Sequence, residues 1–366
     1  MTPRALFVGR GRLVLPLQPW LGKKWDALSE VLDVRVLNAG TGAGDDRFRL
    51  LPDSAPAFYS RLPFEVAREL RAFSPDVVIA SDPFLGVAAR VARSAARSRA
   101  RIVVEVHGDP RTFTRGYRSP LRRSVAQLAD ALARAGIRGA DATRALSPFT
   151  SSLVEEVRGL PATASFPTYS DLEAFAETPL APVPEEHRIV FVGALEAYKN
   201  VDGLAAAWRR VAGQVPEARL TVVGRGSRRA VIDELVRDVP GVEHHESLDP
   251  VDVVAQLDRA RALVLPSWPE GLGRVVLEAF ARGRTVVATN AGGIPDIVTD
   301  GENGILVPRA DERALVGGLV CVLQDHELAT RLGAAARVAY EPWHQTAADF
   351  ARSYRDLVDR VLAGAR

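Results

Sequence analysis

Short apolar runs rich in β-branched residues alternate with helical segments along the chain, and this alternation restricts the fold more than any other feature. In the first half, strands are predicted at Ala5–Val8, Val34–Leu37, Pro75–Ala80 and Arg101–Val106. Helices are predicted at Lys23–Val31, Phe84–Ala96, from Ser119-Pro120 onwards and at Ser147–Val157. Strands that alternate with helices predict a parallel sheet covered by helices on both faces.

The same pattern restarts after a proline-rich stretch at residues 177–187. Strands are predicted at Arg188–Val192, Arg219–Val223, Ala262–Leu265 and Thr285–Thr289, and helices at Val201–Val211, Arg228–Val236 and Arg274–Arg282. A chain of 366 residues suits two domains of about 150–200 residues. We therefore expect a stiff linker at 177–187 between two α/β domains.

Charge is distributed unevenly, with a net charge of +10 for residues 1–150 and −8 for residues 151–366. A basic half suits phosphate, anionic lipid or nucleic acid as a partner. The single cysteine, Cys321, excludes a disulfide within the chain and a thiolate metal cluster. Arg4, Arg10 and Arg12 interrupt the apolar N-terminal stretch, which argues against a signal peptide. A cytoplasmic protein is expected.

The loop after the strand at Ala262–Leu265 reads Pro266-Ser-Trp-Pro-Glu-Gly-Leu-Gly273 and leads into a predicted helix. Its glycines let the backbone approach a ligand closely, and the unpaired N–H groups of a helix start attract a diphosphate. Glu270 and Glu278 are carboxylates of the kind that bind hydroxyl pairs of a sugar or a ribose. The residues alone favour an anion pocket with two hydroxyl readers and leave open an ordinary strand–turn–helix.

This segment resembles the E-x7-E motif of the retaining glycosyltransferases of family 4, the group 1 glycosyl transferases, which have the GT-B fold. The run Gly283–Pro308, Phe191-Val-Gly193 with Lys199, and Leu220-Thr-Val-Val-Gly-Arg-Gly226 are similar to the same family. The resemblance implies two Rossmann-like α/β/α domains that face each other across a cleft. It implies an acceptor-binding domain at 1–180, a nucleotide-sugar-binding domain at 187–345 and, at 346–366, a C-terminal helix that packs back on the first domain.

The resemblance also implies the roles of individual residues. Glu270 would contact the hydroxyls of the donor sugar, Glu278 those of the ribose, and Lys199 would neutralise the departing diphosphate. Further donor-binding residues implied in the same way are Gly193, Gly224, Gly271, Leu272 and Gly273. No cofactor is then required, since the donor substrate is a nucleoside-diphosphate sugar, and no metal is expected because no Asp-x-Asp motif is convincing.

One position departs from the family pattern. The family has an arginine directly after the glycine of the first strand, where this chain has Ala194. Another cation is therefore expected to take over part of the phosphate contact. Arg225 and Arg274 are the candidates, and Arg274 is favoured because it opens the phosphate-binding helix.

In the first half, His107 ends a predicted buried strand, where ligands of open α/β sheets bind. The residue alone also fits a satisfied core histidine. It resembles the family histidine that meets the donor sugar and is expected to hydrogen-bond that sugar near the anomeric centre. Gly22, Lys23 and Lys24, at a predicted helix start, are candidate acceptor-side residues, with a basic surface turn as the alternative.

A basic segment with no acidic residue spans Arg111–Arg123 and contains five arginines. The predicted helix that follows carries an apolar stripe of Leu121, Val125, Leu128 and Leu132. We expect this surface to rest on an anionic membrane on the inner face, where a lipid-linked acceptor would lie. A stripe that faces the protein core is the alternative.

These observations support a retaining hexosyltransferase that moves a hexose from a nucleoside-diphosphate sugar to an acceptor hydroxyl of a glycan, a glycolipid or a small glycoside precursor. A nucleotide-sugar epimerase on the same fold is one alternative, and it needs carboxylates poised to abstract a sugar proton. A nucleic-acid-binding module is the other, and it needs aromatic residues interleaved with the arginines of the first half. Neither pattern is found, and no nucleic-acid partner is expected.

Overall fold

The computed structural model describes residues 2–111, 125–268 and 270–364 and divides the chain into two compact units. The first unit holds the described residues before Leu172 together with those from Gln345 onwards, and the second unit is Leu172–His344. The predicted helix start at Ser119-Pro120 and four of the five arginines of the basic segment lie outside the described residues.

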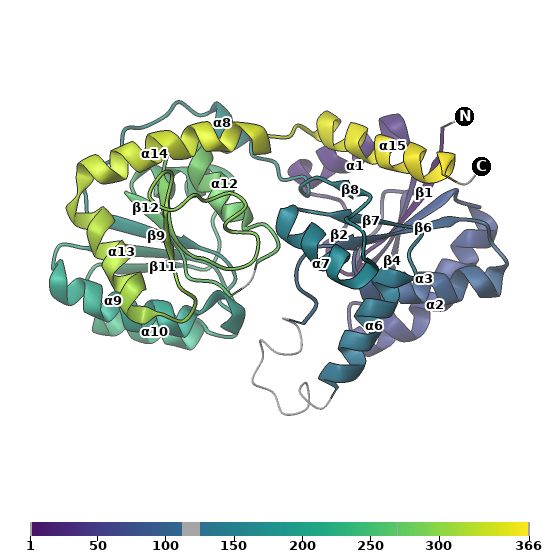
Figure 1. The fold of residues 1–366 in the computed structure, drawn as a ribbon, viewed down its shortest axis with the longest axis horizontal. Helices are drawn as coiled ribbons and strands as arrows, with labels where there is room; N and C mark the ends of the chain where they lie inside the picture. The colour runs from purple at the N-terminus through teal and green to yellow at the C-terminus, as the bar shows by residue number, and fades with distance from the viewer. Residues whose placement is uncertain (1, 112–124, 269, 365–366) are drawn as a thin grey trace. The chain divides into compact units, whose positions relative to one another are not determined.

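The first unit is built on a parallel sheet whose strands follow the order β2-β3-β1-β5-β6-β7-β8, with β4 paired to β3. The strands are β1 (Arg4–Val8), β2 (Leu13–Val14), β3 (Asp33–Thr41), β4 (Phe48–Leu51), β5 (Val77–Ala80), β6 (Arg101–Val106), β7 (Ala142–Ala145) and β8 (Ala164–Ser165). The helices are α1 (Pro19–Val31), α2 (Ala55–Ala72), α3 (Pro83–Ala96), α6 (Ala126–Arg138), α7 (Pro148–Arg158) and α15 (Ala347–Ala363), as labelled in Figure 1.

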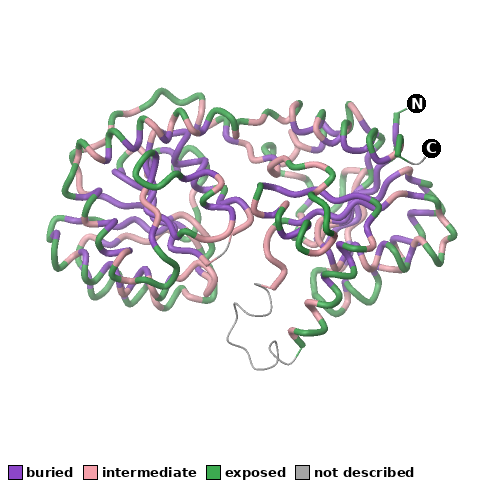
Figure 2. The backbone as a smooth tube through the Cα atoms, viewed as in Figure 1, coloured by how far each residue is buried: buried purple, intermediate pink, exposed green. Residues whose placement is uncertain are grey.

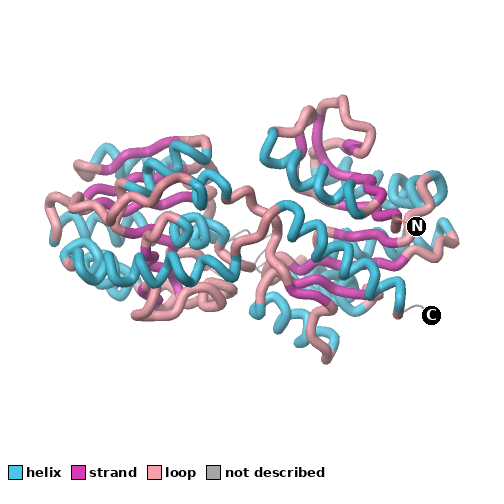
Figure 3. Tube along the Cα trace, turned by 90° about the horizontal axis from the view of Figure 1, so that it is seen from above, coloured by secondary structure: helices cyan, strands magenta, loops and turns pink. Residues whose placement is uncertain are grey.

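The second unit has a parallel sheet in the order β11-β10-β9-β12-β13-β14. Its strands are β9 (Arg188–Val192), β10 (Arg219–Val223), β11 (Val242–His245), β12 (Ala262–Leu265), β13 (Thr285–Thr289) and β14 (Ile305–Val307). Its helices are α8 (Glu173–Glu177), η1 (Ala197–Lys199), α9 (Val201–Gln214), α10 (Arg229–Asp238), α11 (Pro250–Asp258), α12 (Arg274–Ala281), α13 (Glu312–Gln324), α14 (His326–Tyr340) and η2 (Glu341–Trp343). In both units the strands lie between helices (Figure 3).

Each sheet is covered on both faces, and the period-two alternation of strand side chains distributes residues between the two cores. In β1, Ala5 and Phe7 enter the core under α1 and α15, whereas Leu6 and Val8 enter the core under α2 and α3. The central strands, such as β5, β6, β12 and β13, are therefore buried along nearly all of their length, and buried stretches run through the inside of both units in Figure 2. This double burial is the reason that they read as continuous apolar runs in the sequence.

The apolar spacing from Trp343 to Leu362 is that of one amphipathic helix, but α15 begins only at Ala347, because Thr346 and Asp349 form a reciprocal capping box. Phe350, Tyr354 and further residues of α15 then pack into the core of the first unit. The last helix of the chain is thus part of the unit formed by the first residues.

Candidate functional site

The loops that follow β9 and β10 pack tightly against each other at the carboxyl ends of these strands. The Gly193 amide donates to the Val223 carbonyl over 2.9 Å. Gly224 has φ of +151°, and a Cβ placed there would lie 1.9 Å from the Gly193 carbonyl oxygen. Only glycine fits at Gly224, and the two loops form one compact backbone surface.

Lys199 closes the short helix η1, and its ammonium lies 2.5 Å from Oε1 of Glu270. Both side chains are largely buried, with 11% of Lys199 and 14% of Glu270 exposed. Asn200, the next residue, adopts the left-handed conformation with φ of 54°, which an asparagine tolerates. This residue turns the chain from η1 into α9 immediately after the lysine.

Glu270 is held by its backbone in an isolated parallel bridge with Gly292, and its carbonyl accepts from the Gly293 amide over 2.8 Å. Gly273 then turns the chain with φ of +77° and caps α12 without a side-chain hydrogen bond to the helix. The first turn of α12 therefore presents backbone N–H groups that no cap side chain satisfies. Such groups, at the positive end of the helix dipole, suit an anionic ligand.

Glu278 lies on the same helix and is buried, with 7% of its surface exposed. Burial raises the pKa of its carboxyl above the ordinary value, while Arg274 and Lys199 act in the opposite direction. Arg274 Nε lies 3.2 Å from Glu278 Oε1, one turn away on α12. The guanidinium is 62% exposed, so Arg274 combines a carboxylate partner with access to solvent.

The predicted residues of the second unit thus lie around one place at the carboxyl edge of its sheet. Lys199 faces Glu270, and Arg274 faces Glu278. The glycine-rich turn, Gly271-Leu-Gly273, lies between Glu270 and Arg274 in the chain. Arg225, the other candidate cation, is exposed on the loop after β10. The residues gathered here are Gly193, Lys199, Gly224, Glu270, Gly271, Leu272, Gly273, Arg274 and Glu278.

The predicted helix start near Gly22 is wrong, because α1 begins at Pro19, which fills the first helical position. Gly22 and the two lysines therefore lie within the first turns of α1. Lys23 pairs with Asp171 over 3.1 Å. Lys24 lies 4.6 Å from the ring centre of Trp25 and 5.5 Å from that of Phe350, so its ammonium is directed toward the core of the first unit.

His107 follows β6 at the carboxyl edge of the first sheet, as the sequence predicts. Its Nε2 lies 3.0 Å from Oε2 of Glu105, and 41% of the side chain is exposed. Glu105 is itself buried and is bound by Arg144 and Tyr354. The histidine therefore has one ring nitrogen engaged by the protein and an exposed ring face.

Sequence reasoning missed Glu105, Arg144 and Tyr354. The available signal was a charged residue inside each of two apolar strands, since a buried charge is rare unless it is paired. Their partnership depends on the register that sets Glu105 opposite Arg144 in the parallel strands β6 and β7. The apolar pattern of the two strands is compatible with more than one register and does not specify this pairing.

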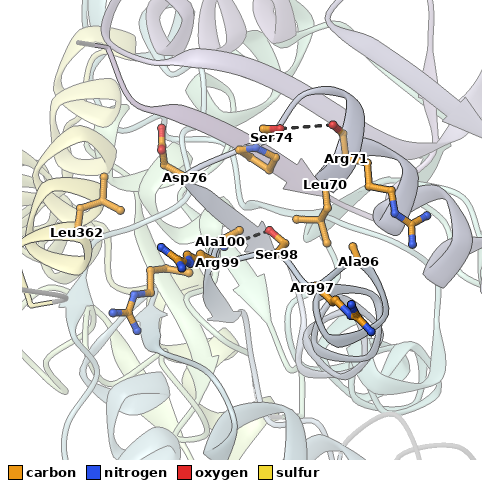
Figure 4. A pocket seen from close by; sticks show the side chains of 12 residues that line it. Leu70, Arg71, Ser74, Asp76, Ala96, Arg97, Ser98, Arg99, Ala100 and Leu362 are labelled. Atoms are coloured by element: carbon orange, nitrogen blue, oxygen red, sulfur yellow. Dashed lines mark hydrogen bonds between the residues drawn. The ribbon is translucent and has the colours of Figure 1, made fainter.

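A cavity of about 570 Å³ lies at the opposite, amino edge of the first sheet (Figure 4). It is lined by four arginines, Arg71, Arg97, Arg99 and Arg101, together with Asp76, two serines and apolar residues. Helices α2 and α3 both end beside it, so their negative dipole ends face the arginines. The cavity lies at the amino ends of the strands, whereas ligands of such sheets bind at the carboxyl ends.

Among residues 2–111, 125–268 and 270–364, no three histidine, cysteine or carboxylate side chains come close enough to hold a metal ion. None of the helices in these ranges is long and apolar enough to cross a lipid bilayer.

Two family models match the chain. Residues 186–325 match the model described as glycosyl transferases group 1, and residues 14–165 match the glycosyl transferase 4-like domain. A glycogen synthase of Mycobacterium tuberculosis is 36% identical over 155 residues, which are 41% of this chain and 37% of the relative. A D-inositol 3-phosphate glycosyltransferase of Segniliparus rotundus is 33% identical over 193 residues, 50% of this chain and 43% of that protein. The chain thus spans less than half the length of these curated relatives.

Solved structures match nearly the whole chain. Sucrose-phosphate synthase from Thermosynechococcus elongatus has a TM-score of 0.79 at 18% identity and covers 99% of this chain and 100% of its own. The Anabaena protein HepE in complex with UDP and glucose has a TM-score of 0.71 at 17% identity, with 99% of both chains covered. At such identities the likeness establishes the fold, which is GT-B. With family models matched in both halves, the chain belongs to the group 1 glycosyl transferases and joins a glycosyl transferase 4-like first domain to a group 1 second domain.

Proposed function

We propose that this chain is a retaining glycosyltransferase that moves a hexose from a nucleoside-diphosphate sugar to an acceptor hydroxyl without a metal ion. The observation that carries the proposal is the ion pair between Lys199 and Glu270 beside the start of α12, with Glu278 buried on the same helix. These groups match a ligand that has an anionic centre between two sets of hydroxyls. A nucleotide sugar has this chemistry.

The Lys199–Glu270 pair defines how the site changes when a donor binds. The diphosphate competes with Glu270 for the Lys199 ammonium, and the released carboxylate then accepts hydrogen bonds from the sugar hydroxyls. Backbone N–H groups of Gly271, Leu272 and Gly273 hold the distal phosphate or the sugar, and Glu278 binds the ribose. Before the donor arrives, the two side chains satisfy each other.

In the reaction, the bond between the anomeric carbon and the diphosphate oxygen breaks, and the acceptor oxygen bonds to the same face of that carbon. The acceptor proton passes to the departing diphosphate, so no enzyme nucleophile is needed. Lys199, the start of α12 and Arg274 stabilise the charge that grows on the diphosphate, which lowers the barrier. His107 hydrogen-bonds the sugar near the anomeric centre. Because Lys24 is directed into the core, Gly22 and Lys23, which is 40% exposed, are the remaining residues of α1 on the acceptor side.

The donor is identified first, by thermal shift with uridine, guanosine and adenosine diphosphates and their sugars. Glu270→Ala is then expected to lower transfer at least 100-fold while the protein stays folded. Glu234→Ala, an exposed glutamate on α10 with 56% of its side chain accessible, is the matched control and keeps wild-type transfer. Wild-type transfer by Glu270→Ala would contradict the proposal.

Further readouts separate the details of the reaction and the alternative functions. The anomeric configuration of the product, read by NMR, tests retention, and a chelator that leaves the rate unchanged supports catalysis without a metal. Release of nucleotide that requires an acceptor supports transfer, whereas a product epimerised at the sugar would identify an epimerase. A salt-dependent shift of DNA would instead identify a nucleic-acid-binding protein.

We also propose that α6 rests on an anionic lipid bilayer at the inner face of the membrane. Val125, Leu128 and Leu132 are 45%, 63% and 40% exposed, so the described part of the apolar stripe does not face the core. The segment before α6 carries four arginines, and Arg111 precedes it. An apolar stripe beside arginines suits acidic headgroups.

Sedimentation with phosphatidylglycerol vesicles and with phosphatidylcholine vesicles tests this surface. The wild type is expected to sediment with the anionic vesicles, and Leu128→Glu with Leu132→Glu is expected to abolish it. Val338→Glu changes an apolar residue on α14 that is more exposed than either leucine, at 72%, and serves as the control. Equal recovery with both kinds of vesicle would overturn the membrane proposal and leave the transfer reaction untouched.

A further inference from the structure

A buried ion pair lies behind His107 in the first unit. Glu105 and Arg144 stand opposite each other in β6 and β7, and Arg144 Nη1 donates to Glu105 Oε1 over 2.6 Å. Their side chains are 6% and 1% exposed. Because both charges are out of water, each depends on the other and on further hydrogen bonds for its stability.

Those further hydrogen bonds come from segments far apart in the chain. The Tyr354 hydroxyl, on α15, donates to Glu105 Oε1 and also accepts from Arg144 Nη1 over 3.0 Å. Arg144 Nη2 donates to the carbonyls of Phe166 and Pro167 over 3.0 and 2.8 Å. The Glu105 carboxylate is therefore fixed in position from two sides.

The second oxygen of Glu105 is the one that meets His107. Oε2 lies 3.0 Å from His107 Nε2, so Oε1 serves Arg144 and Tyr354 while Oε2 serves the histidine. Burial raises the pKa of Glu105, but Arg144, His107 and Tyr354 outweigh it and hold the pKa well below its usual range. An ionised carboxylate only accepts hydrogen bonds, so Nε2 carries the proton and Nδ1 is left for a ligand.

We infer that Glu105 is a positioning residue for His107 and that Arg144 and Tyr354 hold Glu105 in place. Glu105 fixes the Nε2–H tautomer and the orientation of the ring, so that Nδ1 is presented at the strand end. The inference rests on the proposed function only in that His107 meets the substrate. It makes the last helix of the chain, through Tyr354, a contributor to the geometry of the site.

The first test is spectroscopic and needs no activity. In proton NMR at low temperature, a Nε2–H of His107 bound to a carboxylate gives a downfield resonance that exchanges slowly, assigned by its loss in His107→Asn. Glu105→Gln is expected to abolish this resonance and Tyr354→Phe to weaken it. Persistence of the resonance in Glu105→Gln would overturn the inference.

Matched controls separate the network from general effects of buried substitutions. Glu69→Gln changes a glutamate of the same unit that is 4% exposed and paired to Arg35 over 3.1 Å. Tyr340→Phe changes a buried tyrosine, 1% exposed, whose hydroxyl has no hydrogen-bond partner in the described structure. Both are expected to keep the resonance. If Glu105→Gln does not fold, Tyr354→Phe carries the test, and an unchanged resonance in it overturns the inference.

The second test uses transfer. Glu105→Gln is expected to lower kcat at least tenfold and Tyr354→Phe about threefold, with KM for the donor within twofold of wild type. A purely structural role would instead lower the folded fraction and leave kcat per folded molecule unchanged, which overturns the inference. Absence of transfer in the wild type would contradict the proposed function, whereas the NMR result would stand.

Discussion

At the scale of single residues, the two carboxylates of the candidate donor site have different surroundings. Glu270 has Lys199 at 2.5 Å, whereas Glu278 is buried on α12 beside the exposed guanidinium of Arg274. Burial raises the pKa of Glu278, so its carboxylate is lost at a higher pH than that of an ordinary glutamate. The raised pKa makes the ionisation of Glu278 sensitive to milder acid than that of an ordinary glutamate.

This difference predicts how donor binding depends on pH. A donor that binds ionised Glu278 more tightly than the neutral carboxyl must bind more weakly as the pH falls through the raised pKa. Affinity for the nucleotide sugar, measured by calorimetry, is expected to fall about tenfold from neutral to mildly acidic pH, since hydrogen bonds to charged groups are the stronger ones. Glu278→Gln cannot titrate and is expected to bind weakly without this dependence. If donor affinity has the same pH dependence in Glu278→Gln as in the wild type, that dependence belongs to another titrating group.

The second prediction at the scale of residues concerns the effect of Lys24 on stability. Burial lowers its pKa from 10.5 to about 8, against the attraction of Glu105. Between these two pH values the unfolded chain holds a proton that the folded chain lacks, so stability rises with pH in this window. Below about pH 8 Lys24 is protonated in both the folded and the unfolded chain, so the folded state bears the full free-energy cost of burying the ammonium.

Lys24→Met is therefore expected to raise the free energy of unfolding by about 1–2 kcal/mol at pH 7, with the gain lost above the unfolded pKa. Lys23→Met is the control, since Lys23 is 40% exposed and paired to Asp171. Lys23→Met is expected to lower the free energy of unfolding by less than about 1 kcal/mol. Urea unfolding at pH 7 and at a pH above 10.5 measures the free energy of unfolding of each variant and of the wild type. Destabilisation by Lys24→Met at pH 7 would refute the prediction.

At the scale of elements, the proline-rich segment that the sequence indicates as a linker is fastened to the second unit. Three arginines, each no more than 3% exposed at the side chain, donate to backbone carbonyls of this segment and of Phe175 just before it. Arg282 also pairs with Asp258 over 2.9 Å. The carbonyls belong to Phe175, Thr178 and Pro179 for Arg282, Ala181 and Pro182 for Arg284, and Pro184 and Glu185 for Arg261.

The guanidinium fork is what suits an arginine to this task, because it donates in several fixed directions at once. Arg282→Lys leaves several carbonyls and Asp258 with one donor group and is expected to lower the free energy of unfolding by about 2–4 kcal/mol. Arg210→Lys, at a guanidinium 65% exposed and paired to Glu312, is expected to change it by less than about 1 kcal/mol. Equal effects of the two substitutions in urea unfolding would contradict this account.

The strands that the sequence predicts correctly are those buried on both faces, such as β6 and β12, because continuous apolar runs mark them. The sequence pattern does not reveal the long helix α2, which has Pro63 inside it and an exposed Phe64 that obscure its periodicity. Around the site, chain neighbours such as Glu270 and Gly273 follow from one motif. The Glu105–Arg144 pair does not, because only strand register brings it together.

At the scale of the whole molecule, each unit encloses its own cores, and the chain passes between the units near residues 171 and 344. The last passage delivers α15 to the first unit, where Phe350, Leu357 and Val358 are fully buried. Each unit therefore has the cores of an independently folding body. Two cooperative transitions are expected on heating.

Nucleotide binding is expected to act on one of these transitions alone. A ligand at 100 times its Kd adds about 2.7 kcal/mol to the unit that binds it, which raises the Tm of a unit of this size by about 5–10 °C. Scanning calorimetry of Arg282→Lys and Lys24→Met assigns the transitions, since Arg282 lies in the second unit and Lys24 in the first. The transition lowered by Arg282→Lys should be the one that the nucleotide raises. A nucleotide shift confined to the transition that Lys24→Met raises would place the binding site in the first unit and contradict the donor site built around Glu270.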